Sequence, residues 1–307
     1  MLKNFLFKQI LVFFGVIALV SCKKEDLFSQ QDTSTTIHSH TQEEINTMAR
    51  MATENLTMGN PSNATTSTTN PTNYLITKTT WSASYHKDRG IPNWVSWHLD
   101  PTWLGSASRC DCFASDLTLP TGWYRVSTSS YSGSGFDRGH MCPSADRTYS
   151  SADNRETFLM TNMIPQAPNN NQRTWVGLEN YERTLVNQGN ECYIICGSYG
   201  IGGTGSSGTK NTLDAGRVTV PKQIWKVLIA IPRGTNDVAR VTTSSRIIAI
   251  NTPNINTLNT NWGVYRTSVD AIEAAMSATF PGFDLFSNLP DDIEAVLESR
   301  VDNGPTQ

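Results

Sequence analysis

The sequence predicts a mixed α+β domain with a mainly antiparallel sheet at its core. Short apolar runs separated by turn-rich loops are typical of strands, and they outnumber helical segments in residues 74–300. This length suits one domain with a substantial core, and no internal repeat divides it. The strand-like runs are residues 74–79, 94–99, 192–196, 218–220, 224–231 and 246–251.

Two segments have the periodicity of helices. Apolar residues recur at helical spacing in residues 171–186. A second helix is expected over residues 269–279, because Thr267 or Ser268 can accept a hydrogen bond from its first turn, and Asp270 and Glu273 add favourable negative charge there.

The first 21 residues have the features of an export signal. Lys3 and Lys8 give a positive start, and the apolar run 10–20 is too short to cross a membrane comfortably. The signal ends in Leu-Val-Ser-Cys, which resembles a bacterial lipobox, so we expect cleavage before Cys22 and lipidation of that cysteine. The protein would then be an exported lipoprotein of the outer membrane or cell surface. Ordinary secretion and an uncleaved anchor helix are the alternatives.

The composition of residues 22–73 predicts a disordered polar tether. Ser, Thr, Asn and Gln dominate this segment, and large apolar side chains are few. Such a segment cannot bury enough apolar surface to offset the loss of chain entropy on folding. We therefore assign residues 74–300 to the folded domain and residues 301–307 to a tail.

The stretch FDRGHMCPSADR, residues 136–147, contains the first group of side chains suited to catalysis. Arg138 and His140 flank Gly139, and a glycine lets the backbone pass close to a bulky ligand. A guanidinium and an imidazole at such a place suit a phosphate group and a water molecule. The stretch therefore predicts a site for an anion beside a histidine base.

The second group lies in NNNQRTWVGLENYER, residues 169–183. Asn171, Glu179 and Arg183 fall at spacings of eight and four, so we place all three on the predicted helix. Eight residues of helix rise about 12 Å, so Asn171 and Glu179 cannot both bind one ion directly. One of them must act through water. Glu179 and Arg183 are one turn apart and are expected to pair.

These two stretches together resemble the DNA/RNA non-specific endonucleases of the ββα-metal finger class. The resemblance rests on DRGH at residues 137–140, TNMIPQ at residues 161–166 and the asparagine-rich helix that follows. Weaker similarity extends from about Tyr74 to Leu297. The resemblance implies an α+β fold with a ββα-metal finger as the active site.

The resemblance also implies an enzyme that cuts both DNA and RNA and leaves 5′-phosphate ends. His140 would be the general base, Asn171 the direct metal ligand, and Glu179 an acid that holds metal-bound water. Mg²⁺ suits an amide ligand that leaves the ion most of its waters, with Mn²⁺ as the second choice. The family's supporting catalytic residues match Arg138, Asn162 and Arg183.

Phosphodiester hydrolysis accounts for these residue types. The diester is anionic and repels hydroxide, so a cation on the phosphate and a neutral base near pH 7 are needed. Asp137 or a backbone carbonyl is expected to orient the imidazole of His140. Two other classes stay open: a catalytically silent surface lipoprotein that binds nucleic acid or a partner, and a phosphodiesterase that acts on small esters.

The net charge argues against strong long-range attraction of nucleic acid. It is −3 for the whole sequence, and removal of the signal takes away two lysines and no acid, which leaves −5. A protein that relied on its overall field to bind nucleic acid would be basic. Binding must then be local, and we assign it to Arg138, Arg183, Arg147 and Arg173, with Arg155 as a further contributor.

Apart from the lipidation site, five cysteines remain, so at least one thiol is free. A bridge from Cys142 to Cys110 or Cys112 would stiffen the site. A zinc site is the alternative, but Cys-x-Cys lacks the usual two-residue spacer. Cys192 and Cys196 share one side of an apolar strand, where we expect buried thiols.

Two further features receive structural interpretations. The glycine-rich residues 197–210 lack the spacing of known phosphate-binding loops, so we expect a mobile surface loop. Trp94, Trp97 and Trp103 could stack on bases. Their alternating strand pattern favours positions in the core instead.

Overall fold

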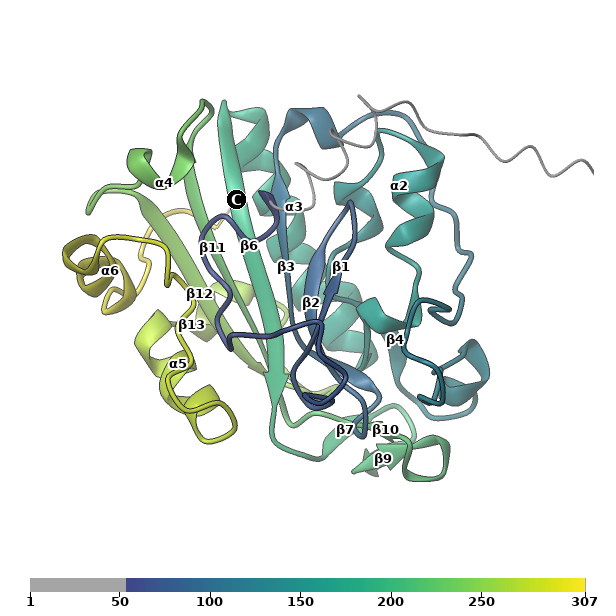
Figure 1. Cartoon of the computed structure of the whole chain (residues 1–307). Coiled ribbons are helices and arrows are strands. Elements are labelled where there is room, and N and C mark those ends of the chain that lie inside the picture. Colours follow the sequence, from purple (N-terminus) through teal and green to yellow (C-terminus); the bar gives the residue numbers. More distant parts are fainter. Residues whose placement is uncertain (1–53, 307) are drawn as a thin grey trace, which may run out of the picture. The chain divides into compact units, whose positions relative to one another are not determined.

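A seven-stranded antiparallel sheet forms the centre of the structure, a computed structural model that describes residues 54–306 (Figure 1). Its strand order is β1-β2-β3-β6-β11-β12-β13, and every neighbouring pair is antiparallel. The predicted α+β class with an antiparallel core is therefore confirmed. The strands are β1 (Tyr74–Thr77), β2 (Ser82–His86), β3 (Ile91–Leu99), β6 (Asn190–Tyr199), β11 (Gln223–Pro232), β12 (Arg246–Pro253) and β13 (Arg266–Thr267).

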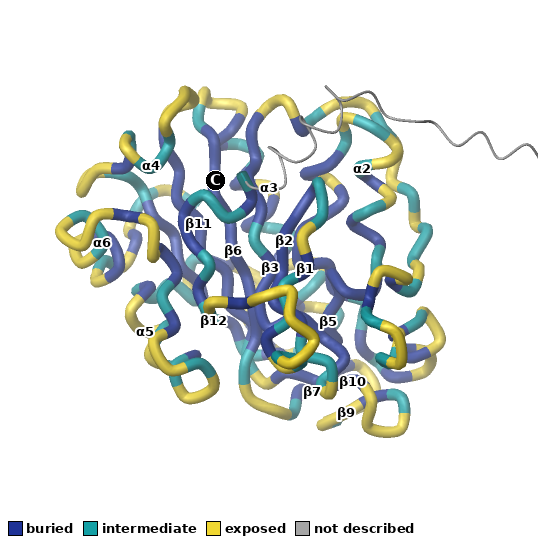
Figure 2. Tube along the Cα trace, viewed as in Figure 1, coloured by how far each residue is buried: buried dark blue, intermediate teal, exposed yellow. Residues whose placement is uncertain are grey.

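Both faces of the sheet are buried, as the dark strands β3, β6 and β11 in Figure 2 show. Along β6, Ile194 belongs to one hydrophobic cluster, and its neighbours Tyr193 and Ile195 belong to the other. Successive side chains of a strand point to opposite faces, so a strand covered on both sides must be apolar throughout. This explains why the sequence of the central strands is a continuous apolar run.

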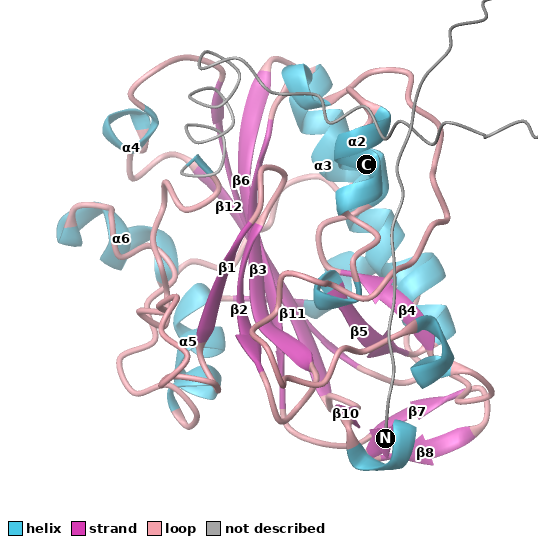
Figure 3. Ribbon diagram, turned by 45° about the vertical axis from the view of Figure 1, so that its right-hand side comes forward, coloured by secondary structure: helices cyan, strands magenta, loops and turns pink. Residues whose placement is uncertain are grey.

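α-Helices cover the two faces, and five of them lie wholly within residues 54–306. Figure 3 shows α3 on one side of the sheet and α5 and α6 on the other. Leu178 and Leu185 of α3 belong to one core cluster, whereas Val269 and Ile272 of α5 belong to the second. The helices are α2 (Ser151–Glu156), α3 (Val176–Asn187), α4 (Asp237–Arg240), α5 (Val269–Ser277) and α6 (Asp291–Glu298).

The second predicted helix is confirmed as α5, together with its cap. Ser268 lies at the N-cap in an extended conformation, and its Oγ accepts a hydrogen bond of 3.2 Å from the Ala271 backbone N–H. Asp270 lies in the first turn, as expected. The capping hydroxyl satisfies one of the backbone donors that a helix leaves free at its start.

Three small antiparallel pairs accompany the large sheet. They are β4 (Asp137–His140) with β5 (Met163–Gln166), β7 (Gly203–Gly205) with β8 (Gly208–Lys210), and β9 (Thr212–Leu213) with β10 (Val218–Thr219). The prediction of a mobile loop at residues 197–210 is wrong, because this segment ends β6 and forms the β7–β8 hairpin. A Cβ on Gly205 would overlap the carbonyl oxygen of Gly135. The glycine is there because the hairpin packs closely on another segment.

The predicted tether is wrong for residues 54–73, which are packed on the domain. Met58 and Ala64 are buried, and the Asn55 side chain donates to the Thr79 carbonyl. The indole of Trp94 donates to Ser62 Oγ at 2.8 Å. Few apolar residues suffice here because the segment covers a core that other elements supply.

The predicted tail is also part of the domain as far as residue 306. Asp302 is buried and forms ion pairs with Arg246 at 3.0 Å and with Arg266 at 3.2 Å. The folded body therefore extends beyond residue 300. The predicted export signal, Cys22 and the rest of the proposed tether lie outside the described residues. Within residues 54–306, no helix is both long enough and apolar enough to cross a membrane.

The cysteine pairing differs from the expected one. Cys110 and Cys112 form a disulfide with each other, and Cys142 is a buried free thiol, so the predicted bridge to Cys142 is wrong. The residue between the two bridged cysteines has a positive φ of 48°, which closes the tight ring. Cys192 and Cys196 are buried thiols on β6, as predicted.

The tryptophan prediction is confirmed. Trp94, Trp97 and Trp103 are all at most 2% exposed and belong to the core. Their burial removes them as stacking platforms for bases.

Candidate active site

The DRGH stretch forms β4, whose register with β5 places Gly139 opposite Ile164 and His140 opposite Met163. A Cβ on Gly139 would overlap Gln166 Oε1 and lie 2.6 Å from Gln166 Cβ. Gln166 is fully buried, so it has little room to move. The glycine is required by this protein neighbour and not by a bulky ligand, which corrects the sequence interpretation.

The predicted helix begins with a π-helical turn, Asn170–Trp175, and continues directly as α3. Asn171, Glu179 and Arg183 therefore lie on one continuous helical segment, as expected. The wide turn was not expected, and it means that α-helical geometry does not give the angle between Asn171 and Glu179. Together β4, β5 and α3 make a ββα unit beside the large sheet (Figure 3).

A polar cavity of about 400 Å³ opens beside this unit. Of the predicted site residues, Arg138 and Asn171 line it. Six other polar lining residues were not predicted: Arg109, Asp111, Thr128, Tyr131, Ser132 and Gln172. The complete lining is Arg109, Asp111, Phe113, Thr128, Tyr131, Ser132, Phe136, Asp137, Arg138, Asn171 and Gln172.

His140 lies behind the cavity wall and is held by aromatic rings. Its imidazole is 5.5 Å from the Phe113 ring and 4.8 Å from the Phe158 ring, between centroids. Burial lowers the pKa of His140 to about 3, and the positive charges of Arg109 and Arg138 act in the same direction. The imidazole is therefore neutral at pH 7. No group among residues 54–306 forms a hydrogen bond with its buried Nε2.

Asp137 orients Asn171 and does not orient His140, so the first of the two expected arrangements for the imidazole is wrong. Its Oδ2 accepts hydrogen bonds of 2.8 Å from Asn171 Nδ2 and from Gln172 Nε2. Because the amide nitrogen of Asn171 faces Asp137, its oxygen is left for another ligand. An amide oxygen next to a carboxylate, in a polar cavity, is a donor set that suits a hard cation such as Mg²⁺.

Arg109 is held at the cavity by three contacts. Its guanidinium forms an ion pair with Asp111 at 2.6 Å, donates to Ser144 Oγ at 2.9 Å and lies 4.9 Å from the Phe158 ring. The Cys110–Cys112 ring follows directly in the chain and fixes this corner. The pattern RCDC is visible in the sequence, but the sequence alone does not show that its two cysteines pair with each other next to Arg109.

Behind α3 lies a buried cluster of charges that contains two predicted residues. Glu179 and Glu182 face Lys226 of β11, whose Nζ is 3.9 Å and 3.3 Å from their carboxylates. Arg183 ion-pairs with Asp146 at 2.6 Å, so the expected direct partner, Glu179, is instead an electrostatic neighbour.

Burial governs the protonation of this cluster. It raises the pKa of Glu179, and it raises the pKa of Glu182 to about 8 against the opposing charge of Lys226. Burial disfavours the charged form of Lys226, but Glu182 and Glu179 outweigh it and raise the pKa of that amine. Lys226 also lies over Trp175, 4.5 Å from the ring, so the cation is held in place from both sides.

Replacement of Lys226 by methionine is expected to destabilise the fold by about 3–5 kcal/mol, the usual effect of leaving buried charges without a partner. The loss should be larger at pH 8 than at pH 5. Without Lys226 the buried acids stay protonated to higher pH, whereas they ionise near pH 4.5 when unfolded, so stability falls as pH rises. Urea unfolding at both pH values measures this. The exposed Lys222→Met should change stability by less than about 0.5 kcal/mol, and equal losses for both variants would contradict the prediction.

Two predicted residues form hydrogen bonds with backbone groups through their side chains and do not line the cavity. Arg147 is fully buried and donates to the carbonyls of Thr80 and His98, so its predicted role in substrate binding is wrong. Asn162 is also fully buried. Its amide oxygen accepts a hydrogen bond from the backbone N–H of Cys142, and its amide nitrogen donates to the Cys142 carbonyl. Cys142 lies two residues after His140. Asn162 positions the histidine strand and has no polar atom left for substrate.

The remaining predicted arginines differ in exposure. Arg138 lines the cavity, with its guanidinium 4.1 Å from the Phe113 ring. Arg183 is partly buried next to Glu179, outside the cavity lining. Arg173 is exposed on the π-helical turn, two residues after Asn171. The structure thus gathers Arg138, His140 and Asn171 at one place and keeps Glu179 and Arg183 behind it.

A histidine on a short strand, an amide on the helix of the same ββα unit and arginines around a polar cavity define a nuclease site of the ββα-metal type. A model of the DNA/RNA non-specific endonuclease family matches residues 58–292. The chain belongs to this family. Its predicted enzyme class, an endonuclease that hydrolyses DNA and RNA, is thereby confirmed, and the family is metal-dependent.

Individual relatives agree with this assignment. A nuclease of Nostoc sp. is 46% identical over 248 residues, which are 81% of this chain and 86% of the relative. Mitochondrial endonuclease G of Bos taurus is 33% identical over 44% of this chain and 47% of its own length, and mitochondrial nuclease EXOG of Mus musculus is 32% identical over 50% and 43%. The chain thus spans most of the Nostoc nuclease and less than half of the two mitochondrial proteins.

The fold has a solved counterpart. The crystal structure of EndoG in complex with EndoGI matches with a TM-score of 0.58 and 21% identity, over 75% of this chain and 89% of that one. At this identity the similarity concerns the fold alone.

Proposed function

We propose that the protein is a metal-dependent endonuclease that hydrolyses both DNA and RNA by activating water with His140. One observation carries the proposal: the neutral imidazole, whose Nε2 has no partner in the described part of the chain, lies beside a cavity that also receives the Asn171 amide and two arginines. A neutral imidazole can take a proton from water near pH 7, as the attack on a phosphodiester requires.

Asn171 would bind Mg²⁺ directly through its amide oxygen, with Mn²⁺ as the second choice. Asp137 holds the amide in the orientation that this needs. When bound, the ion supplies positive charge to the phosphate and to the departing 3′ oxygen. Glu179 would act through water, since it approaches from the buried side and does not line the cavity. Departure of the 3′ oxygen leaves 5′-phosphate products.

Arg138 and Arg109 would bind the phosphate from the cavity wall, where their planar guanidinium groups match its oxygens. Arg183 would favour the charged form of Glu179, because its positive charge opposes the rise in pKa that burial causes in that carboxyl group. Arg173 is near enough in the chain to contact the flanking backbone of the substrate. None of these groups requires a ribose 2′ hydroxyl, which is why both nucleic acids should be cut.

Digestion of supercoiled plasmid and of structured RNA by the purified protein tests the proposal. We expect cleavage of both with Mg²⁺, complete loss with a chelator, and restoration by added metal. Hydrolysis of a chromogenic diester without cleavage of long DNA would indicate a small-ester phosphodiesterase. Binding of nucleic acid without cleavage at any metal concentration would indicate a silent binding protein. Either result would overturn the proposed activity.

We further propose that the enzyme is exported and anchored to a membrane through a lipid on Cys22. The sequence around that residue supports this proposal. A nuclease that cuts both DNA and RNA would also destroy nucleic acid in its own cytoplasm. Cys22→Ser should release the protein from the membrane fraction or block its maturation. Metabolic labelling with a fatty-acid analogue provides the measurement. Unlabelled wild-type protein found wholly in the medium would show free secretion instead.

A further inference from the structure

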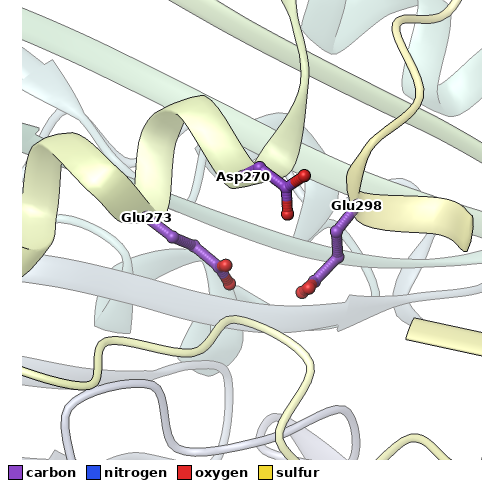
Figure 4. Close-up of side chains that lie close together, drawn as sticks. All are labelled: Asp270, Glu273 and Glu298. Atoms are coloured by element: carbon purple, nitrogen blue, oxygen red, sulfur yellow. The ribbon is translucent and has the colours of Figure 1, made fainter. Parts of the chain in front are cut away.

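Five carboxylates gather around the ends of α5 and α6, on the face of the sheet opposite α3. Asp270, Glu273 and Glu298 each bring one oxygen within 4.8 Å of the others (Figure 4). Asp284, Glu294 and Glu298 form a second triad of the same closeness. Glu298 belongs to both triads and is therefore the centre of the cluster. None of the five residues lines the catalytic cavity.

Glu298 is buried without a hydrogen-bond partner for one of its oxygens. It is only 7% exposed, and no donor among residues 54–306 reaches its buried Oε1. Figure 4 shows its side chain directed toward that of Glu273. The Oε1 atom of Glu294 is likewise buried and unpartnered. Buried carboxylate oxygens without a donor are unfavourable, and a cation at this place would relieve that cost.

The described chain does not supply enough positive charge. No lysine or arginine of residues 54–306 forms an ion pair with these acids, and nearby Arg300 donates to the carbonyls of Thr243 and Ser245 instead. Backbone N–H groups satisfy one oxygen of Glu273 and one of Asp284. Burial, followed by repulsion from Glu273 and Glu294, raises the pKa of Glu298 to about 9. Side-chain hydrogen bonds also join Glu298 to Glu273 and Glu294 to Asp284. Among the buried carboxylate oxygens of the described residues here, Glu298 Oε1 and Glu294 Oε1 are the ones left for a cation.

We propose that the cluster binds one Ca²⁺ ion, with Glu298 as the central ligand, and that this ion ties α6 to α5 and to the loop at Asp284. Several carboxylate oxygens from separate elements match the six to eight oxygen ligands that Ca²⁺ accepts in flexible geometry. Mg²⁺ fits less well, because it requires strict octahedral geometry and keeps most of its waters. The ion stabilises the fold and takes no part in nucleic acid cleavage.

Calcium titration of the full chain carrying Asn171→Ala tests this, since that change removes the proposed catalytic ligand. We expect calorimetry to detect one bound Ca²⁺ ion. We also expect the melting temperature to rise by about 5–10 °C at a calcium concentration of about 100 times Kd, as preferential binding to the folded state requires. Absence of both effects would overturn the proposal.

Glu298→Gln in the same background should abolish calcium binding and the calcium-dependent rise. Without calcium it should melt at a higher temperature than its parent, because glutamine removes the cost of keeping a buried acid protonated at neutral pH. Glu273→Gln should act in the same direction and replaces it if Glu298→Gln fails to fold. The matched control is Asp292→Asn, an exposed acid of α6 outside both triads, which should respond to calcium as the parent does.

A competing account is that the acids only share protons with one another. In that case no calcium binds, and the melting temperature falls from pH 6 to pH 9 by the same amount with and without calcium. The reason is that these acids have a raised pKa in the folded state. The folded protein therefore loses stability as pH rises through that range. That outcome would overturn the calcium site and leave the nuclease proposal untouched, since the catalytic cavity is separate.

Discussion

Replacement of His140 by alanine is expected to lower the rate of DNA cleavage by about two to four orders of magnitude, the usual contribution of a positioned general base. The imidazole is neutral at pH 7 because burial and two arginines lower its pKa. No other histidine of the described chain adjoins the cavity. Single-turnover cleavage of a labelled duplex at saturating Mg²⁺ measures the effect.

His86→Ala is the matched control for this experiment. His86 is a half-buried histidine at the end of β2, where its Nδ1 accepts from the Arg89 backbone N–H, and it does not line the cavity. We expect wild-type cleavage rates from it. A His140→Ala protein that keeps its rate, or a His86→Ala protein that loses as much, would remove His140 from the role of base.

A substrate with a good leaving group separates the attack by water from the departure of the leaving group. If His140 activates the attacking water, the His140→Ala variant stays slow even when the leaving group departs easily. Full recovery with such a substrate would show that His140 protonates the leaving group instead. The pH profile gives a second check. Because only the neutral imidazole accepts a proton, the acid limb of kcat/KM should lie below the ordinary histidine pKa of about 6.5.

The parts of the fold that the sequence predicted are those determined by local pattern. The run 224–231 became β11 almost residue for residue, because β-branched and aromatic residues suit a strand wherever it pairs. Thr267 and Ser268 indicated the start of α5 to within one residue, since capping depends on the next three residues only, and the structure has Ser268 as the cap. The site motifs were equally local. Arg138 and His140 are two residues apart on one strand and necessarily share a face of it.

What the sequence could not give depends on contacts between distant segments. Arg147 has a side chain that could bind phosphate. Only the fold shows that it is stacked on Trp103 and hydrogen-bonded to the carbonyl of Thr80. Residues 54–73 lack the apolar content to fold alone. Contacts such as that of the Asn288 amide with the Thr57 carbonyl, 231 positions away, hold them in place. Composition measures whether a segment can build a core, not whether it can cover one.

The second large effect is expected from Asn171→Ala, which should abolish metal binding at the catalytic cavity together with activity. The amide oxygen is the proposed direct ligand, and alanine leaves Asp137 without the partner that it orients. Glu179→Gln should weaken metal binding by about 10 to 100-fold, as changes beyond the direct ligands do. Calorimetric titration with Mg²⁺ or Mn²⁺ measures both. Every protein compared should also carry Glu298→Gln, so that the carboxylate cluster does not contribute.

Asn187→Ala is the control, because Asn187 is an exposed asparagine at the end of α3, well along the chain from the cavity residues. It should bind metal like its parent. The order of the two active-site variants decides the assignment. If Glu179→Gln lost the ion more completely than Asn171→Ala, Glu179 would be the direct ligand. The buried cluster of Glu179, Glu182 and Lys226 would then have to open toward the cavity when metal binds, and metal would shift the pKa of Glu182 downward from about 8.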